Sequence, residues 1–164
     1  MPGGHFDYLG NISSRHYPKN NMDNTEILHK EIDLIQGIIN RMANNSFLLK
    51  GWIISLIAVI LALTKDTIIA TQLSYFNLIL LLPVVVFWYL DAFFLHKERC
   101  YRKLYDWVIA NRSKTQDYLY NLNYTRFEKE VNSIFRIMFS KTLWPFYGLI
   151  ILVLIALAFH NLFL

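Results

Sequence analysis

The chain has 164 residues, of which 55% are hydrophobic and 16% aromatic, and its formal net charge is +4. The hydrophobic residues are gathered in three long blocks instead of being dispersed, which is typical of a membrane protein and excludes an ordinary soluble domain. The single cysteine, Cys100, excludes a disulfide framework and a paired-thiol metal site. A reduced thiol in the cytoplasm is the simplest interpretation of it.

The first part of the chain divides into an irregular segment and a helix. Residues 1–22 show no periodicity and are rich in Gly, Pro, Asn and Ser, so we expect a flexible N-terminal extension. Residues 23–46 are predicted to form a cytoplasmic amphipathic helix that runs on into the first apolar block. Its apolar stripe, in steps of four and three, is formed by Leu28, Ile32, Ile35, Ile39 and Met42.

Three transmembrane helices are predicted, at 47–64, 75–95 and 143–164, each near the ~20 residues that a helix needs to cross a bilayer. The predicted fold class is therefore all-α: a transmembrane helical hairpin with cytoplasmic helical extensions, plus a C-terminal third transmembrane helix. Aromatic residues are expected at the inner membrane interface. These residues are Trp52, Trp144 and Tyr147.

The distribution of positive charge predicts the orientation. Ten of the sixteen lysines and arginines lie between residues 97 and 141, whereas Lys65 alone lies between the first two blocks. Because cytoplasmic segments are enriched in Lys and Arg, we expect the N-terminus and residues 96–141 inside a bacterial inner membrane and the C-terminus outside.

Residues 96–141 are predicted to be a cytoplasmic helical segment. The second transmembrane helix is expected to continue to about Ala110 with a stripe that faces the first one, and both stripes are also candidate surfaces for oligomerisation or a partner. A turn region is predicted at 111–123, and the next helix is expected to open with Thr125 and Glu128 as a capping box. The second stripe contains Tyr101, Leu104, Tyr105 and Val108, and the apolar face of the later helix contains Phe127, Val131, Ile134, Phe135 and Met138.

Asp91 is a carboxylate near the end of the second apolar block, in the sequence FWYLDAFFLHKER. One interpretation is a buried charge that pairs across helices with Lys50, at a similar depth, or that lines a pore mouth. The alternative is an acid at the membrane boundary balanced by Lys97 and Arg99. We favour a structural pairing, because acids at the boundary cost much less than acids at mid-membrane.

Two further features have a simple interpretation and a functional one. The basic and aromatic run at 96–107 could suggest nucleic acid, but its position beside a span favours anionic lipid. Its lipid-facing cations are predicted to be Lys97, Arg99, Arg102 and Lys103. Pro83 removes a backbone hydrogen bond from the second span and is expected to kink the helix there. The kink is either a tolerated packing feature or a gating hinge.

Catalysis finds no support in the sequence. It contains no Gly-rich phosphate loop, no His and Cys cluster at metal-ligand spacing and no nucleophile elbow, and no cofactor is implied. The predicted cytoplasmic segments are too small for a substrate pocket. We therefore expect a protein that is not an enzyme and that has the lipid bilayer, further copies of itself and a protein regulator as partners.

Two segments suggest a family. The first, RMANNSFLLKGW at 41–52, joins a polar NNSF step to a KGW boundary; the second, FWYLDAFFLHKERCYRKLYDW at 87–107, ends a span in LDAFFL before a basic and aromatic helix. In these features, over roughly residues 25–110, the chain resembles the SLATT-type proteins, small bacterial two-span effectors of defence loci. The resemblance implies an effector that stays silent until a partner senses infection and then forms a depolarising pore. The third span departs from that plan, which leaves open which helix would line a pore.

Two functions follow as hypotheses. The first is a membrane effector that oligomerises and permeabilises the inner membrane in phage defence, since one chain has too few spans to enclose a channel. The second is a membrane anchor or scaffold that holds a soluble partner through its cytoplasmic helices. A transporter subunit is the least favoured, because the spans carry almost no polar residues at mid-membrane depth.

Overall fold

The computed structural model describes residues 24–64 and 80–163, and all the regular structure in these two ranges is helical. The elements are α1 (Asn24–Thr64), α4 (Leu81–Asn111), the 3-10 helix η1 (Thr125–Glu130), α5 (Ile134–Met138) and α6 (Trp144–Phe163). The prediction of an all-α chain is therefore confirmed. The predicted N-terminal extension and the start of the predicted second span lie outside the described residues.

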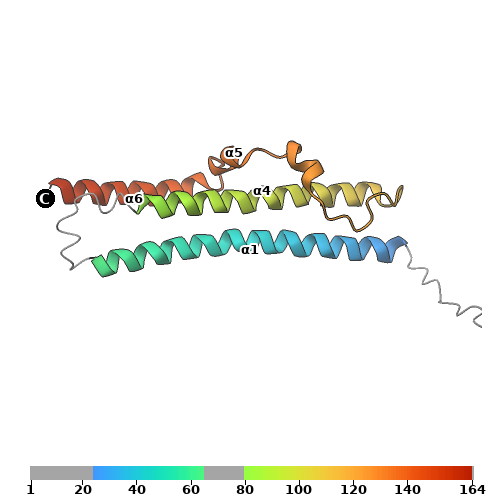
Figure 1. Cartoon of the computed structure of the whole chain (residues 1–164), viewed down its shortest axis with the longest axis horizontal. Coiled ribbons are helices and arrows are strands. Elements are labelled where there is room, and N and C mark those ends of the chain that lie inside the picture. The colour runs from blue at the N-terminus through green and yellow to red at the C-terminus, as the bar shows by residue number, and fades with distance from the viewer. Residues whose placement is uncertain (1–23, 65–79, 164) are drawn as a thin grey trace, which may run out of the picture.

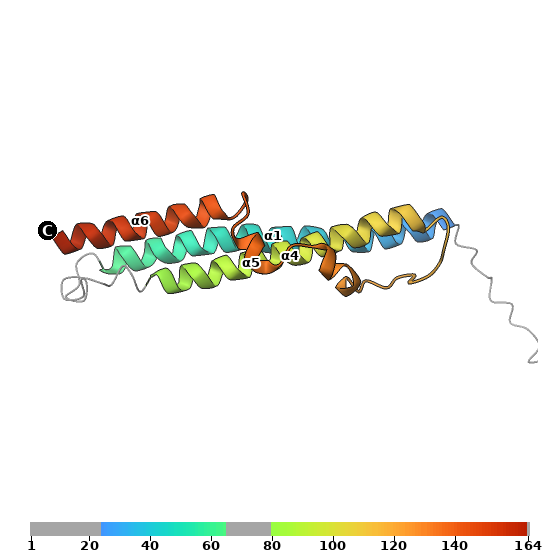
Figure 2. The same ribbon diagram turned by 90° about the horizontal axis from the view of Figure 1, so that it is seen from above.

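The molecule is long and narrow, with three helices side by side at one end and two at the other. Helices α1 and α4 pack against each other, and α6 lies beside them only toward the end where the C-terminus is found (Figure 1; Figure 2). We call this end the three-helix half, and we call the part formed by α1 and α4 without α6 the stalk. The segment 112–143, here the return segment, leads from the stalk back along α4 to the start of α6.

Helix α1 is a single rod of 41 residues, about 60 Å long at the ordinary rise per residue. It contains no proline, and neither Gly37 nor Gly51 is required by close packing, because a Cβ at either position would meet nothing within 4 Å. The amphipathic stretch and the first apolar block are thus one continuous helix, as the sequence indicated. Helix α4 continues past the second apolar block to Asn111 in the same way.

The prediction of one helix after the turn region 111–123 is wrong. The chain instead forms a short 3-10 helix, an extended stretch from Val131 and then the five-residue helix α5. The predicted capping box is also absent, because Tyr124 is the N-cap of η1 and makes no side-chain cap bond. The reason is that Phe127 and Met138, assigned to one face, belong to two different cores.

The expectation of a kink or hinge at Pro83 stays a prediction, because residues 65–79, which precede α4, lie outside the described residues. In the described part of the chain α4 begins at Leu81, so Pro83 occupies its first turn. Backbone N–H groups of a first helical turn have no partner within the helix, and proline loses nothing there.

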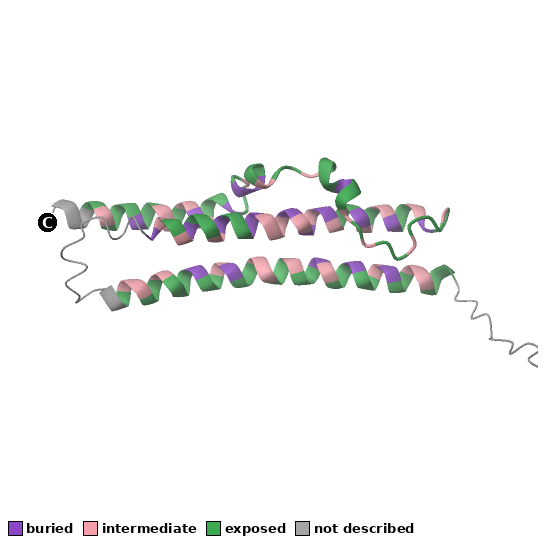
Figure 3. Cartoon of the chain, in the orientation of Figure 1, coloured by how far each residue is buried: buried purple, intermediate pink, exposed green. Residues whose placement is uncertain are grey.

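The described residues form one apolar core in each half. Buried residues are found along the whole length of α1 and α4 (Figure 3). The stalk core joins the two predicted stripes face to face within one chain, so those stripes are not a free surface for oligomerisation. Its buried members are Ile35, Ile39, Leu104, Val108 and Phe127, and Leu28, Ile32, Tyr101 and Tyr105 pack against them. Met42, the last member of the first stripe, is half-buried. The buried core of the three-helix half includes Ile53, Val84, Trp88, Leu143, Tyr147 and Leu154.

Large apolar side chains are exposed on the three-helix half, on all three helices. Examples are Phe47, Trp52, Val59, Leu82, Val85, Leu149 and Leu152. Among the described residues, α1 is the one helix that is long and apolar enough to cross a membrane by length and composition, and the apolar stretch of α6 is shorter. Packing within the described part of the chain leaves these side chains exposed.

The stalk core yields a stability prediction. Leu104→Ala removes a fully buried side chain and is expected to lower the free energy of unfolding by about 2–5 kcal/mol. Ile109→Ala, on the same helix but 49% exposed, should cost under about 1 kcal/mol. Hydrogen–deuterium exchange of the 28–42 backbone should rise in the first variant and not in the second. Equal exchange in the two variants would contradict the pairing of the stripes.

Candidate functional site: a buried carboxylate between three helices

Asp91 lies where α1, α4 and α6 meet, and none of its surface is exposed. Lys50 of α1 donates from Nζ to Asp91 Oδ2 at 2.6 Å, and the Tyr147 hydroxyl of α6 donates to the same oxygen at 3.1 Å. Ser46 of α1 donates its hydroxyl to Asp91 Oδ1. We call these four residues the Asp91 site. One carboxylate thus receives hydrogen bonds from both neighbouring helices.

The cation of the site is tied to its own helix as well. Lys50 Nζ also donates to the Ser46 hydroxyl at 3.0 Å and to the Ser46 carbonyl at 3.2 Å, one helical turn earlier. The Lys50 side chain is 24% exposed, so the pair is buried on the carboxylate side and open on the lysine side. The structure therefore brings together the two residues that the sequence analysis paired. It does not bring Lys97 or Arg99 to Asp91 as the alternative required.

Aromatic rings close the site on the side of α6. The Trp88 and Tyr147 rings are stacked with centroids 5.7 Å apart, and Trp88 Nε1 donates to the Met138 carbonyl at 3.0 Å. Tyr147 is fully buried, so its ring is covered by protein, and its expected depth at the membrane interface stays a prediction. The sequence analysis missed Tyr147 and Ser46 as partners of Asp91. The one available signal was that Ser46 precedes Lys50 by four residues, on the same helix face.

The energetics of the Asp91 site follow from its burial. A buried carboxylate without partners costs several kcal/mol, which only close and well-oriented donors offset. Three donors converge here from two helices, so any displacement of α1 or α6 relative to α4 would leave charge or hydroxyl groups unpaired. The site therefore fixes how the three helices fit together more than it adds to their stability.

The basic residues after Asp91 mostly lie beside the return segment, and their predicted contact with lipid stays a prediction. Lys97 Nζ donates to the Tyr124 hydroxyl at 2.5 Å and lies 3.3 Å from Glu128 Oε1. Lys103 and Arg102 also lie within 4 Å of carboxylates of the chain, Glu130 at 3.8 Å and Glu98 at 2.6 Å. Arg99 lines a cleft of about 270 Å³ between α4 and the return segment. This cleft is also lined by Arg102, Lys103, Asp106, Glu130, Val131 and Asn132.

Burial and hydrogen bonding shift the pKa of Lys97 and the pKa of Cys100 in this part of α4. Burial, the largest single influence on Lys97, lowers its pKa, but the hydrogen bonds to Tyr124 and Glu128 outweigh it, so the pKa of Lys97 is raised. Burial raises the pKa of the Cys100 thiol, which has no exposed surface. Cys100 Sγ is 3.7 Å from His96 Nε2, and His96 Nδ1 is 3.0 Å from the Asn132 carbonyl oxygen.

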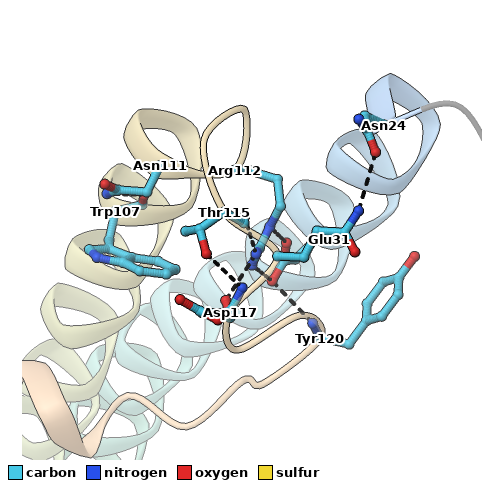
Figure 4. Close-up of polar contacts among 9 residues, drawn as sticks. Asn24, Glu31, Trp107, Asn111, Arg112, Thr115, Asp117 and Tyr120 are labelled. Carbon is cyan, nitrogen blue, oxygen red and sulfur yellow. Dashed lines mark hydrogen bonds and ion pairs between the residues drawn. The ribbon is translucent and has the colours of Figure 1, made fainter.

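A second buried ion pair, Glu31–Arg112, lies at the far end of the stalk (Figure 4). The sequence analysis did not predict it. Arg112 donates to both carboxylate oxygens of Glu31, Nε to Oε2 at 2.6 Å and Nη2 to Oε1 at 2.7 Å. Its Nη1 donates to the carbonyls of Thr115 and Asp117, and Glu31 also accepts from the Tyr120 N–H at 3.2 Å. These bonds hold a loop in which Tyr118 and Tyr120 have positive φ, a conformation that costs a bulky residue roughly 1 kcal/mol or more.

The chemistry available at these sites is hydrogen bonding and charge pairing. No group of three or more His, Cys, Asp or Glu residues among those described could hold a metal ion. The polar groove of about 550 Å³ between α1 and α4 is lined by Gln36, Ile39, Asn40, Arg102, Tyr105 and Asp106. Comparison with protein-family models, with curated proteins and with solved structures finds no match for this chain.

The one-sided exposure of the Asp91 site yields a prediction about its two charges. Lys50→Met leaves the fully buried carboxylate without a cation and is expected to cost about 3–5 kcal/mol. Asp91→Asn leaves a lysine that water can reach and should cost less, about 1–3 kcal/mol. Thermal unfolding of the detergent-solubilised protein, followed by circular dichroism, should therefore show the larger loss for the lysine variant.

The control for this comparison is Lys103→Met, which removes a cation from an exposed pair at 3.8 Å and should change stability by under about 0.5 kcal/mol. The double variant Lys50→Met, Asp91→Asn should cost less than the two single changes added together. Additive losses, or a larger loss from Asp91→Asn, would mean that the two charges do not depend on each other.

The burial of Cys100 predicts low thiol reactivity. Because the thiol is covered and its pKa is raised, alkylation by N-ethylmaleimide at pH 8 should be at least about tenfold slower than in the denatured protein. A Tyr118→Cys variant in a Cys100→Ser background, with the new thiol at an exposed position, should react quickly. Rapid labelling of native Cys100 would contradict this prediction, because it would show that the thiol is accessible to solvent in the folded protein.

Proposed function

We propose that this chain is a membrane effector that inserts three helices into a bacterial inner membrane, self-associates and permeabilises that membrane when triggered. The observation that carries the proposal is the band of exposed large apolar side chains around the three-helix half. Contiguous exposed apolar surface on this scale is unfavourable in water and marks a membrane or protein contact. The stalk, in contrast, is rich in charged residues.

The dimensions of the three-helix half agree with a bilayer. From Phe47, the first large exposed apolar residue of the band on α1, to Thr64 the helix rises about 27 Å, and the 20 residues of α6 rise about 30 Å. The hydrocarbon core of a bilayer is about 30 Å thick. The Asp91 site would then lie at the inner boundary, where Lys50 reaches the headgroups through its exposed side. The excess of Lys and Arg in 97–141 favours a cytoplasmic stalk.

Self-association would have to use the apolar band. The stalk stripes are occupied within the chain, and one copy has too few helices to enclose a channel. Contacts between copies would therefore form through exposed side chains of the spans, such as Val59 and Leu152. The resemblance to SLATT-type effectors supports a role in phage defence, in which a protein regulator would act on the stalk.

The alternative function is a membrane anchor or scaffold for a soluble partner. It is favoured by one specific observation: in the described part of the spans, the buried polar side chains gather at the Asp91 site instead of following one helix face. A water-filled pore would be lined by such a polar face. The two functions differ in whether the membrane leaks.

A membrane-potential dye in cells that express the chain distinguishes them. The native chain is expected to depolarise the membrane on induction, and Asp91→Ala, at equal membrane abundance, should lose at least half of that response, because α6 is no longer held against α4. Asp106→Ala removes an exposed carboxylate from the same helix and should keep the full response.

Two results would count against the effector. One is a native chain that remains monomeric in detergent and never changes the dye signal. The other is a stable complex with a soluble protein on liposomes that retain an entrapped dye, which would favour the anchor. A full response from Asp91→Ala with unchanged oligomer size would remove the Asp91 site from the mechanism.

A further inference from the structure

Helix α5 has two faces with opposite environments. Ile137 and Met138 are buried in the core of the three-helix half, with 0% and 7% of their surfaces exposed. Phe135 and Phe139, four residues apart on the other side, are 70% and 64% exposed. The other described elements leave most of the surface of these two rings uncovered. Two phenylalanines facing outward from a short helix need a partner that accepts aromatic rings.

The exposed face of α5 is held rigidly at the level of the Asp91 site. The Trp88 indole donates to the Met138 carbonyl at 3.0 Å, and its ring meets that of Phe139 edge-on at 5.3 Å. The Phe139 ring lies 5.8 Å from that of Trp144, which is itself 51% exposed. The outward aromatic rings are thus continuous with the ring that packs on Tyr147, at the inner end of the apolar band.

We propose that α5 and the start of α6 form an interfacial foot that lies in the headgroup layer of an anionic bilayer. Phe135, Phe139 and Trp144 would enter the boundary between headgroups and acyl chains, and Arg136 and Lys141 would meet the lipid phosphates. This proposal rests on the proposed insertion of the three helices. Amphipathic rings and flanking cations are the side chains that such an interface favours.

Charge and continuity identify lipid as the occupant of this face. From Val131 to the C-terminus the chain has no Asp or Glu, and Arg136 and Lys141 are its charged residues. Both are exposed, and the Arg136 guanidinium donates to the neutral Asn132 side chain at 3.3 Å. An anionic surface complements this patch, and the patch continues directly into the apolar band. The same face of a second copy would set like charges against each other.

The test uses a fluorescent label whose emission reports its surroundings. In the full-length chain with Cys100→Ser, NBD is attached at Phe139→Cys, and separately at Phe135→Cys in case one position disturbs packing. Leu152→Cys, exposed on α6, reports insertion of the spans, and Tyr118→Cys reports the stalk. Each protein is reconstituted into vesicles of phosphatidylcholine with 30% phosphatidylglycerol, with quenching doxyl groups on one lipid or the other.

We expect labels at 135 and 139 to be quenched by doxyl lipid, the label at 152 to be quenched strongly, and the label at 118 to remain unquenched. At 139, doxyl phosphatidylglycerol should quench about fivefold more efficiently per lipid than doxyl phosphatidylcholine, because each cation attracts anionic lipid. Arg136→Gln with Lys141→Gln should remove that preference and leave the quenching at 152 unchanged.

The outcomes separate this inference from the proposed function. Quenching at 152 with none at 135 or 139 overturns the foot and leaves the inserted helices standing. No quenching at 152 overturns insertion itself. Labels at 135 and 139 that become shielded from water without quenching by lipid, in a protein that cross-links to itself there, would show that a second copy occupies the face.

Discussion

The buried charge of Asp91 is the constraint on which the three-helix half depends. A carboxylate with no exposed surface requires donors, and the donors available are Lys50 and Ser46 on α1 and Tyr147 on α6. Apolar packing alone would allow the helices to rotate or slide with small changes in energy. The Asp91 site removes this freedom, because only one arrangement pairs all four groups.

The sequence predicted those parts of the structure that depend on local pattern and depth. The facing stripes of α1 and α4 followed from helical spacing, and the approach of Lys50 to Asp91 followed from their similar distance from the ends of a hairpin. Tyr147 was not predictable in this way, because its position depends on how the return segment brings α6 back along α4. Because Tyr147 lies beside two other aromatic residues in the sequence, we predicted that its ring would lie at the membrane interface. In the structure the ring packs against Trp88 and is fully buried.

The return segment shows why periodicity failed where tertiary contacts compete. The spacing of its apolar residues fits one face of a single helix. In the structure, however, Phe127 packs in the stalk core, whereas Ile137 and Met138 pack in the core of the three-helix half. In the stretch between these residues, Glu128 lies close to Lys97 of α4 and Glu130 lies close to Lys103. A single straight helix could not satisfy both cores and these charges, so the chain breaks into η1, an extended stretch and α5. Sequence spacing carries no information about this division.

Two buried ion pairs, Glu31–Arg112 and Lys50–Asp91, connect α1 and α4 at positions about 28 Å apart along α1. Sliding one helix past the other would break both pairs at once, and each broken pair would leave an uncompensated buried charge. The two ion pairs therefore hold α1 and α4 in one register. Helix α6 is attached differently, through one tyrosine hydroxyl and apolar contacts. Within the proposed function, a partner acting on the stalk would therefore move α1 and α4 as one unit, and the Tyr147–Asp91 hydrogen bond would carry that movement to α6.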